Sequence, residues 1–396
     1  MTIKIAHIAD THLGYRQYGL TEREKDFYDI FKKIVDDIIE KDVDYVIHCG
    51  DLFEQPKPPI DALLTAQECF NKLFEHDIPV YVIGGNHDIL QRRETSLPQE
   101  LYTNDKFHIF TTKDNYTILN DEIFLSGLPY ISKNNEKAVK QLLEELVEKS
   151  KGYKHKIVML HGSVSEFFEF NPEFELETIP EGFDYYAMGH LHKRIMTEFR
   201  NGILSYPGST EINNAGEISD YHKSRKGYNI ITIENDKLNP EYIDIELERK
   251  TIRKNIKYPE LDNELEKLEN KINNEILTKT DKKPILILNI VEGDFERSEV
   301  AKRIYDKLGE ISLSIRLTYA PTELIDESIG GIDDDITAEY LLDEKLEKYG
   351  KDVQVLGLEL YKNLSIKNIS EAKKISDRFY EEVYHNQDEG EDNDNQ

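Results

Sequence analysis

The sequence predicts a layered α/β protein: a sheet core flanked by helices, followed by a small α/β domain and C-terminal helices. Short runs such as "IKIAHIAD" (3–10) and "VDYVIHCGD" (43–51) are apolar throughout, which is typical of strands buried on both faces. Between them, "REKDFYDIFKKIVDDIIEK" (23–41) repeats its apolar residues at helical spacing. Helices that cover both faces of apolar sheets give a layered α/β architecture.

The same reasoning identifies the later elements of the chain. Three further apolar runs predict strands: "IPVYVIGGN" (78–86), "HKIVMLHGS" (155–163) and "FDYYAMGHLHKR" (183–194). Strands and helices also alternate further along: "ELDNELEKLENKINNEIL" (260–277), "PILILNIVEG" (284–293), "RSEVAKRIYDKLG" (297–309) and "LSIRLTYA" (313–320). Two short amphipathic helices are expected near the C-terminus, at 338–350 and 369–385, with no core of their own.

Composition limits the classes of function. The chain has 396 residues, which is enough for two or three domains, and its formal net charge is −28. Such an acidic balance by itself argues against nucleic-acid binding, which normally requires a basic surface. The 50 lysines and arginines still allow a locally basic surface, because a local field can differ from the net charge.

Sequence features also predict the compartment. No apolar run approaches the roughly 20 residues that span a bilayer, so we expect no membrane association. The N-terminal "MTIKIAHIAD" has no signal-peptide core and predicts a strand instead. The two cysteines, Cys49 and Cys69, cannot form a disulfide framework, which indicates a reducing compartment. We therefore expect an intracellular, cytoplasmic protein.

Potential metal ligands follow each apolar run of the first 194 residues. The five run ends are Asp10-Thr-His12, Gly50-Asp51, Gly85-Asn86-His87-Asp88, His161-Gly162 and Gly189-His190-Leu191-His192. Because ligands gather outside the carboxyl ends of strands in layered α/β sheets, these ends are expected to meet at one site. The glycines let the backbone turn sharply there. Seven metal ligands are predicted: Asp10, His12, Asp51, Asn86, His161, His190 and His192.

A structural role is the alternative for each of these residues. A single histidine beside an apolar run is more often a core or surface residue, and D-x-H or H-x-H alone occurs by chance. Residues i and i+2 of a strand face the same side, however, and five such ends in this order are not expected by chance. The remaining histidines are expected to be structural or exposed: His7, His48, His76, His108, His155, His222 and His385.

The five motifs resemble those of the calcineurin-like binuclear metallophosphoesterases. Finer features are similar to the Mre-eleven and SbcD family of DNA double-strand-break repair nucleases: "DTHLGYRQYG", "GDLFEQPKP", "GHLHKR" and "SYPGSTE" (205–211). This closer resemblance covers residues 1 to about 235. It implies a manganese-dependent, two-metal DNA nuclease, with exonuclease activity on duplex ends and endonuclease activity on single strands.

The resemblance also implies roles for individual residues. Two Mn²⁺ ions per subunit are expected, although the ligand types do not exclude iron or zinc. One ion would be held by Asp10, His12, Asp51 and His192, and the other by Asp51, Asn86, His161 and His190. His87 is expected to contact the phosphate or the leaving oxygen, and Asp88 either orients His87 or caps the following helix.

Glu54 departs from the family pattern. Many relatives have a histidine three residues after the bridging aspartate, where it is thought to help position the phosphate. A carboxylate there repels a phosphodiester unless it is protonated or turned away. The departure leaves the fold and the metals unaffected and bears on the efficiency and polarity of cleavage.

Two surfaces are expected to contact macromolecules. The first surface consists of the loops at 13–20 and 54–59, where DNA phosphates or bases are expected to contact Tyr15, Arg16, Tyr18 and Lys57. The alternative is that both are ordinary solvated loops. The helix at 59–76 has more apolar surface than one face needs. Packing of this helix on the sheet would explain part of that surface, and the family implies a homodimer through the helix and "SLPQELY" (96–102). We expect a mixture of the two, with Leu64 and Leu101 as the interface residues.

Five segments are predicted along the chain: a nuclease domain (1–238), an α/β cap domain over the DNA (239–322), a linker (323–335), a helical segment (336–385) and an acidic disordered tail (386–396). The helical segment has the pattern of a docking element, and the family implies a Rad-fifty-type ATPase of the SMC class as its partner.

Two other functions are weighed against a nuclease. A phosphatase or small phosphodiesterase would share the metal chemistry but lack the cap and the C-terminal helices. A protein that mainly tethers DNA ends would need neither two metals nor His87. The sequence thus favours a nuclease acting on DNA ends in double-strand-break repair, and such a protein is expected at the nucleoid.

Overall fold

The computed structural model describes residues 2–89, 96–167, 172–320, 351–365, 373–376 and 379. The chain divides into two compact units, Met1–Thr322 and Glu323–Gln396. None of the helices within the described ranges has the length and apolar character that a bilayer crossing requires.

Two six-stranded sheets form the centre of the first unit. The first has the order β12-β11-β1-β2-β3-β4. Its strands are β1 (Ile3–Ile8), β2 (Tyr45–Cys49), β3 (Val80–Ile83), β4 (Phe107–Ile109), β11 (Lys226–Glu234) and β12 (Lys237–Ile245). The second has the order β5-β6-β7-β8-β10-β9. Its strands are β5 (Tyr116–Leu119), β6 (Ile123–Gly127), β7 (His155–His161), β8 (Tyr185–Gly189), β9 (Ile195–Phe199) and β10 (Gly202–Tyr206).

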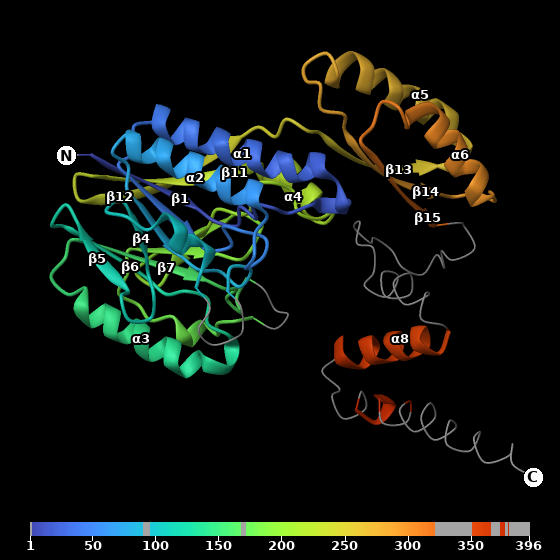
Figure 1. Cartoon of the computed structure of the whole chain (residues 1–396). Helices are drawn as coiled ribbons and strands as arrows, with labels where there is room; N and C mark the ends of the chain where they lie inside the picture. The colour runs from blue at the N-terminus through green and yellow to red at the C-terminus, as the bar shows by residue number, and fades with distance from the viewer. Residues whose placement is uncertain are drawn as a thin grey trace, which may run out of the picture. The chain divides into compact units, whose positions relative to one another are not determined.

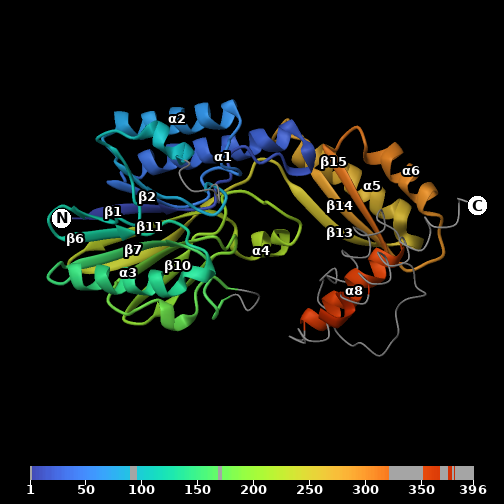
Figure 2. The same cartoon turned by 60° about the horizontal axis from the view of Figure 1, so that its bottom comes forward.

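Helices cover the outer faces of both sheets, so the core has four layers (Figures 1 and 2). α1 (Thr21–Glu40) and α2 (Ile60–Glu75) pack on the first sheet, and α3 (Glu136–Lys149) packs on the second. Apolar side chains of the two sheets meet between them, such as Ile47 of β2 and Met159 of β7. This arrangement confirms the predicted layered α/β class, and both faces of the central strands are buried, as their apolar sequences require.

A smaller α/β unit follows the core. Its parallel sheet has the order β13-β14-β15, with strands Thr251–Lys257, Ile285–Val291 and Ser314–Ala320. α5 (Leu261–Lys271) and α6 (Arg297–Leu308) bury their apolar faces on one side of this sheet (Figure 1). Short elements complete the first unit: η1 (Gln17–Gly19), η2 (Pro98–Tyr102), η3 (Lys133–Asn135), η4 (Leu176–Thr178), α4 (Glu217–Ser224), η5 (Tyr258–Glu260) and η6 (Ile272–Ile276).

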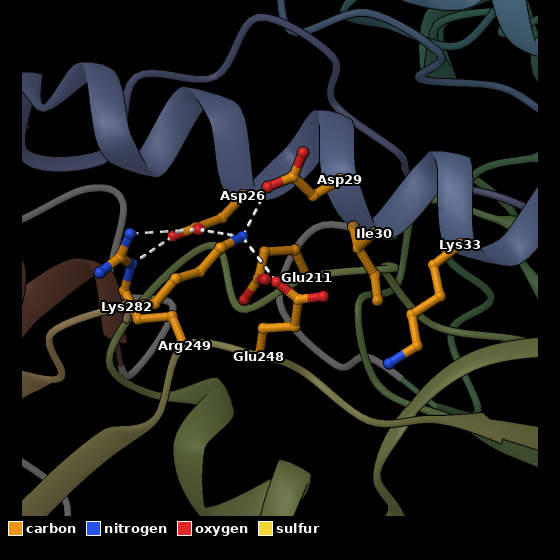
Figure 3. A pocket seen from close by; sticks show the side chains of 8 residues that line it. All are labelled: Asp26, Asp29, Ile30, Lys33, Glu211, Glu248, Arg249 and Lys282. Atoms are coloured by element: carbon orange, nitrogen blue, oxygen red, sulfur yellow. Dashed lines mark hydrogen bonds and ion pairs between the residues drawn. The ribbon is translucent and has the colours of Figure 1, made fainter. Parts of the chain in front are cut away.

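An ion cluster joins the smaller unit to α1 of the core (Figure 3). The buried carboxylate of Asp26 accepts hydrogen bonds from Arg23 Nη1 at 2.6 Å and from Arg249 Nε at 2.5 Å. Lys282 Nζ lies 3.2 Å from the other Asp26 oxygen and also pairs with Asp29 and Glu248. Charges from α1 and from the segments that flank β13 and β14 therefore neutralise one another between the two parts.

One helix, α8 (Lys351–Ser365), is described in the second unit. α8 lies inside the segment predicted to be helical (336–385), between the two individual helices predicted at 338–350 and 369–385. The helix predicted at 338–350, the linker at 323–335 and the tail at 386–396 lie outside the described residues. Of the helix predicted at 369–385, residues 373–376 and 379 are described, and they are helical.

Candidate metal centre

The loops that follow five neighbouring strands meet at one end of the core. Asp10 and His12 follow β1, Asp51 follows β2 and Asn86 follows β3. β1, β2 and β3 run parallel and adjacent in the first sheet, and β7 and β8 do so in the second. Their carboxyl ends therefore lie at the same end of the sandwich. The structure brings together all seven predicted ligands: Asp10, His12, Asp51, Asn86, His161, His190 and His192.

Unusual backbone conformations shape these loops. Four of the seven residues have a positive φ: Asp10 (53°), His12 (45°), Asp51 (53°) and His190 (98°). Such conformations cost energy in residues with a side chain and are found where the surrounding structure holds functional groups in place. At Gly85 a Cβ would lie only 2.2 Å from Asp51 Oδ1. A glycine there is therefore what lets the Asp51 carboxylate approach the loop after β3.

The first donor group consists of Asp10, His12 and His192, with ligand atoms all within 4.8 Å of one another. His12 Nδ1 donates to Glu54 Oε2 at 2.9 Å, and His192 Nδ1 donates to Glu217 Oε1 at 2.9 Å. In their neutral forms both rings then present an Nε2 lone pair, and these two nitrogens lie 3.0 Å apart. A cation held by both lone pairs satisfies this arrangement, so the donor set fits a metal ion.

The second donor group consists of Asp51, His161 and His190, again within 4.8 Å. The amide oxygen of Asn86 joins them, at 2.9 Å from His161 Nε2 and 3.0 Å from His190 Nδ1. His161 Nδ1 donates to the Cys49 carbonyl at 2.7 Å, so in the neutral ring the Nε2 lone pair faces the oxygen atoms of Asp51 and Asn86. This convergence of acceptor atoms also fits a cation.

Asp51 lies between the two groups. Its Oδ2 atom is 3.3 Å from His161 Nε2 and 3.9 Å from His12 Nε2. Burial alone would lower the pKa of His161, but the Asp51 and Asp10 carboxylates outweigh burial and raise that pKa to about 9. Burial would likewise raise the pKa of Asp51, but the facing histidines hold it well below its usual range. The centre therefore concentrates negative charge that divalent cations neutralise.

His87 lies beside the first donor group. Its ring is perpendicular to that of His12, with centroids 4.9 Å apart, and its side chain is 39% exposed. Its Nδ1 atom lies 2.8 Å from the Glu54 carbonyl, and its backbone N–H donates to Asp51 Oδ1 at 2.9 Å. With Nδ1 bonded in this way, Nε2 is the ring nitrogen left for a substrate.

Asp88 acts on the backbone around the site. Its buried carboxylate accepts hydrogen bonds from three backbone N–H groups: Leu52 at 3.3 Å, Phe53 at 3.0 Å and Gly85 at 2.9 Å. These bonds tie the loop after β2 to the loop after β3. The sequence suggested two roles for Asp88, orienting His87 or capping a helix. In the structure the His87 ring is hydrogen-bonded to the Glu54 carbonyl instead.

Three glutamates around the histidines had no role as histidine partners in the sequence analysis. Glu54 and Glu217 accept from His12 and His192, and Glu173 Oε2 lies 3.5 Å from His190 Nε2. The Glu217 carboxylate is buried and also bonds to Lys226 Nζ at 2.7 Å. Burial would raise the pKa of Glu217, but Lys226 and His192 lower it to about 2. Nothing local in the sequence distinguishes Glu173 and Glu217 from the other acidic residues.

The residues expected to contact DNA are spread along the loops beside the centre. Tyr15 packs edge-on against Phe27, and the exposed Arg16 pairs with Glu24 at 2.7 Å. The guanidinium of Arg316, from β15, lies over the Tyr18 ring at 4.9 Å, while Lys57 is exposed.

The leucines expected at a dimer interface are on the surface. Leu64 of α2 is 55% exposed and Leu101 of η2 is 69% exposed, and Ile60 of α2 is 73% exposed. Tyr102 of η2 donates to the Leu63 carbonyl of α2 at 2.9 Å, which joins the two elements. Leu64 therefore lies outside the face of α2 that packs on the sheet, where Ala66, Phe70 and Leu73 are buried.

Comparisons with known proteins show the family of this chain. Residues 3–194 match the family model described as calcineurin-like phosphoesterase. A Methanococcus maripaludis protein named DNA double-strand break repair protein Mre11 is 35% identical over 384 residues, covering 95% of this chain and 99% of that protein. Proteins of the same name from Methanocaldococcus jannaschii and Saccharolobus solfataricus are 40% identical over 272 residues and 32% identical over 378 residues. They cover 67% and 91% of this chain, and 74% and 95% of their own lengths.

Proposed function

The chain belongs to the Mre11 family of DNA double-strand break repair proteins, and from this premise we propose that it is a manganese-dependent nuclease that processes DNA ends. Its core is a calcineurin-like phosphoesterase, so its reaction is the hydrolysis of phosphodiester bonds. The observation that carries the proposal is the position of Asp51 between two groups of metal-binding donors.

We assign one Mn²⁺ ion to Asp10, His12, Asp51 and His192, and the other to Asp51, Asn86, His161 and His190. When bound at these donors, two divalent cations would lower the pKa of an attacking water and would neutralise charge on the phosphate. Mixed carboxylate, amide and imidazole donors suit manganese. The left-handed backbone of Asp10, His12 and Asp51 holds these donors in place before any substrate arrives.

His87 is the proposed catalyst beside the metals. The Glu54 carbonyl holds its Nδ1 atom, so its Nε2 atom is directed to the substrate and contacts the phosphate or the leaving oxygen. Asp88 supports this geometry through the backbone of both loops.

The remaining surfaces are proposed to bind macromolecules. Duplex DNA contacts Tyr15, Arg16, Tyr18 and Lys57, under a cap formed by residues 239–322. A second subunit covers the apolar patch of Ile60, Leu64 and Leu101. A Rad-fifty-type ATPase binds the helical segment at 336–385, and this role places the protein at the nucleoid.

Cleavage of labelled blunt, hairpin and single-stranded DNA with Mn²⁺, beside hydrolysis of a phosphate monoester, tests the proposed function. We expect DNA cleavage that is lost in Asp51→Asn and kept in Asp114→Asn, which alters an exposed aspartate. Hydrolysis of the monoester without DNA cleavage would identify a phosphatase. Tight binding of DNA ends without any cleavage would identify a tether.

A further inference from the structure

We propose that Glu54 is a positioning residue of the metal centre: its carboxylate orients the His12 ring toward the first metal ion, and its backbone carbonyl orients His87. This inference rests on the proposed function. It assigns a role to the position at which the chain departs from the family's histidine.

The backbone of Glu54 is fixed against the loop that carries His12. Glu54 N–H donates to the Leu13 carbonyl at 3.1 Å, and Leu13 N–H donates to the Leu52 carbonyl at 2.9 Å. The segments after β1 and β2 are therefore hydrogen-bonded in both directions. From this position the Glu54 carboxylate lies 2.9 Å from His12 Nδ1.

The hydrogen bond determines which nitrogen of His12 can bind a metal. A carboxylate that accepts from Nδ1–H fixes the tautomer, turns the lone pair of Nε2 inward and raises its basicity. In this structure His12 Nε2 faces His192 Nε2 at 3.0 Å, and Glu217 acts on His192 in the same way. Both histidines of the first donor group are thus held by carboxylates.

The same hydrogen bond turns the Glu54 carboxylate away from the place of the phosphate, where its charge would repel the substrate. The Glu54 carboxylate is directed at His12, and its Oε2 atom is 3.8 Å from His87 Nδ1. His87 Nδ1 is nearer to the Glu54 carbonyl oxygen, at 2.8 Å. The side chain therefore serves His12, and the main chain serves His87. Truncation of this side chain in Glu54→Ala removes the contact to His12 and keeps the contact to His87.

Metal titration of the full-length, metal-free protein tests this role without requiring activity. Free Mn²⁺ is measured by electron paramagnetic resonance during titration of wild type, Glu54→Gln, Glu54→Ala and the control Glu145→Ala, which alters an exposed residue of α3. We expect Glu54→Ala to lower the affinity for one of the two Mn²⁺ ions by about 10- to 100-fold and to leave the affinity for the other unchanged. Glu54→Gln should be intermediate, because its amide oxygen still accepts the hydrogen bond without the charge.

Single-turnover cleavage separates this role from one at the substrate. Saturating Mn²⁺ should restore the cleavage rate of Glu54→Ala, because the contact to His87 remains. Wild-type affinity for both ions in Glu54→Ala would overturn the proposal, and so would a raised KM for DNA with unchanged metal binding. If Glu54→Ala fails to fold, the same titration of the isosteric Glu54→Gln tests the proposal: lower affinity for one ion supports it, and wild-type affinity for both ions overturns it. A wild-type protein that binds fewer than two ions would instead contradict the proposed function itself.

Discussion

At the residue scale, three of the four candidate histidine ligands are hydrogen-bonded through the ring nitrogen that faces away from the other donors. His12 and His192 donate to carboxylates, while His161 donates to the Cys49 carbonyl. Partners of this kind fix the tautomer and orientation of a ligand before the metal binds. The functional unit is therefore larger than the set of residues that would touch the metal.

Asn86 and His87 are neighbours, but we predict that substituting them affects different properties: metal affinity for Asn86 and cleavage rate for His87. Asn86→Ala removes an oxygen that faces His161 and His190, so the second ion should bind more weakly and extra Mn²⁺ should partly restore cleavage. His87→Ala should keep both ions and DNA binding, and should slow cleavage by roughly 10²–10⁴-fold. Elemental analysis beside single-turnover cleavage measures both effects. A His87→Ala protein that loses a metal, or cuts at the wild-type rate, would refute this assignment.

At the element scale, α2 and η2 present an apolar patch to the surface. Ile60, Leu64 and Leu101 are each more than half exposed, although nearby Phe70 and Leu73 are buried. Apolar residues grouped in this way are typical of protein interfaces. The patch lies on elements that are packed together through Tyr102, so it is a preformed surface.

The double substitution Leu64→Asp with Leu101→Asp is expected to convert a dimer into monomers. Two unpaired charges in a buried interface cost several kcal/mol each, on the order of the whole stability of a modest dimer. Light scattering measures the size. Ala138→Asp adds a negative charge to the exposed face of α3 and should leave the dimer intact. An unchanged mass in the double variant would show that these leucines lie outside any interface.

α8 is the described element of the second compact unit. Its apolar residues include Val353, Leu356 and Leu360, which share one face, and Val355 is half exposed. A helix with such an apolar face is typical of a docking segment.

Deletion of residues 331–396 should therefore leave Mn²⁺-dependent nuclease activity intact and abolish binding to the ATPase. The two sheets, the seven donors and the smaller α/β unit all lie before this segment. Cleavage assays and co-sedimentation with the ATPase measure the two properties separately. An inactive or unfolded truncation would mean that this segment is part of the enzyme core.

At the scale of the whole first unit, the ion cluster around Asp26 joins the core to the smaller α/β unit. Asp26 accepts hydrogen bonds from Arg23 and Arg249 and forms an ion pair with Lys282, and its side chain is only 3% exposed. Cations from three separate segments therefore depend on one buried carboxylate. Without Asp26, Arg249 would lose its carboxylate partner, while Arg23 would keep Glu211 and Lys282 would keep Asp29 and Glu248. Loss of one partner from a buried ion pair is strongly destabilising.

Asp26→Asn is expected to lower the free energy of unfolding by about 3–5 kcal/mol, because Arg23, Arg249 and Lys282 would lose their shared counter-charge. The matched control is Asp29→Asn, whose side chain is 48% exposed and which pairs with Lys282. That change should cost about 1 kcal/mol or less. Chemical denaturation of both variants measures the difference, and equal stabilities would show that the cluster does not hold the two parts together.

The fold class, and the meeting of the seven candidate ligands at one end of the core, could be predicted from the sequence. Strands that are buried on both faces have continuous apolar runs, and the polar residues that end them stand out against this background, as Asp10, Asp51 and His161 do. Both signals are local, so they can be read without a structure. Shorter or half-exposed strands such as β4, β5 and β9 lack this contrast and were not predicted.

Only the tertiary structure decided which residues support the ligands. Glu54 is 42 residues from His12, Glu217 is 25 residues from His192 and Arg249 is 223 residues from Asp26. The chain has 78 acidic residues, most of which are ordinary surface charges by type and spacing. A carboxylate acquires a specific role when folding places it at hydrogen-bond distance from a buried partner and removes the water between them. That proximity depends on how distant segments pack, which no local pattern records.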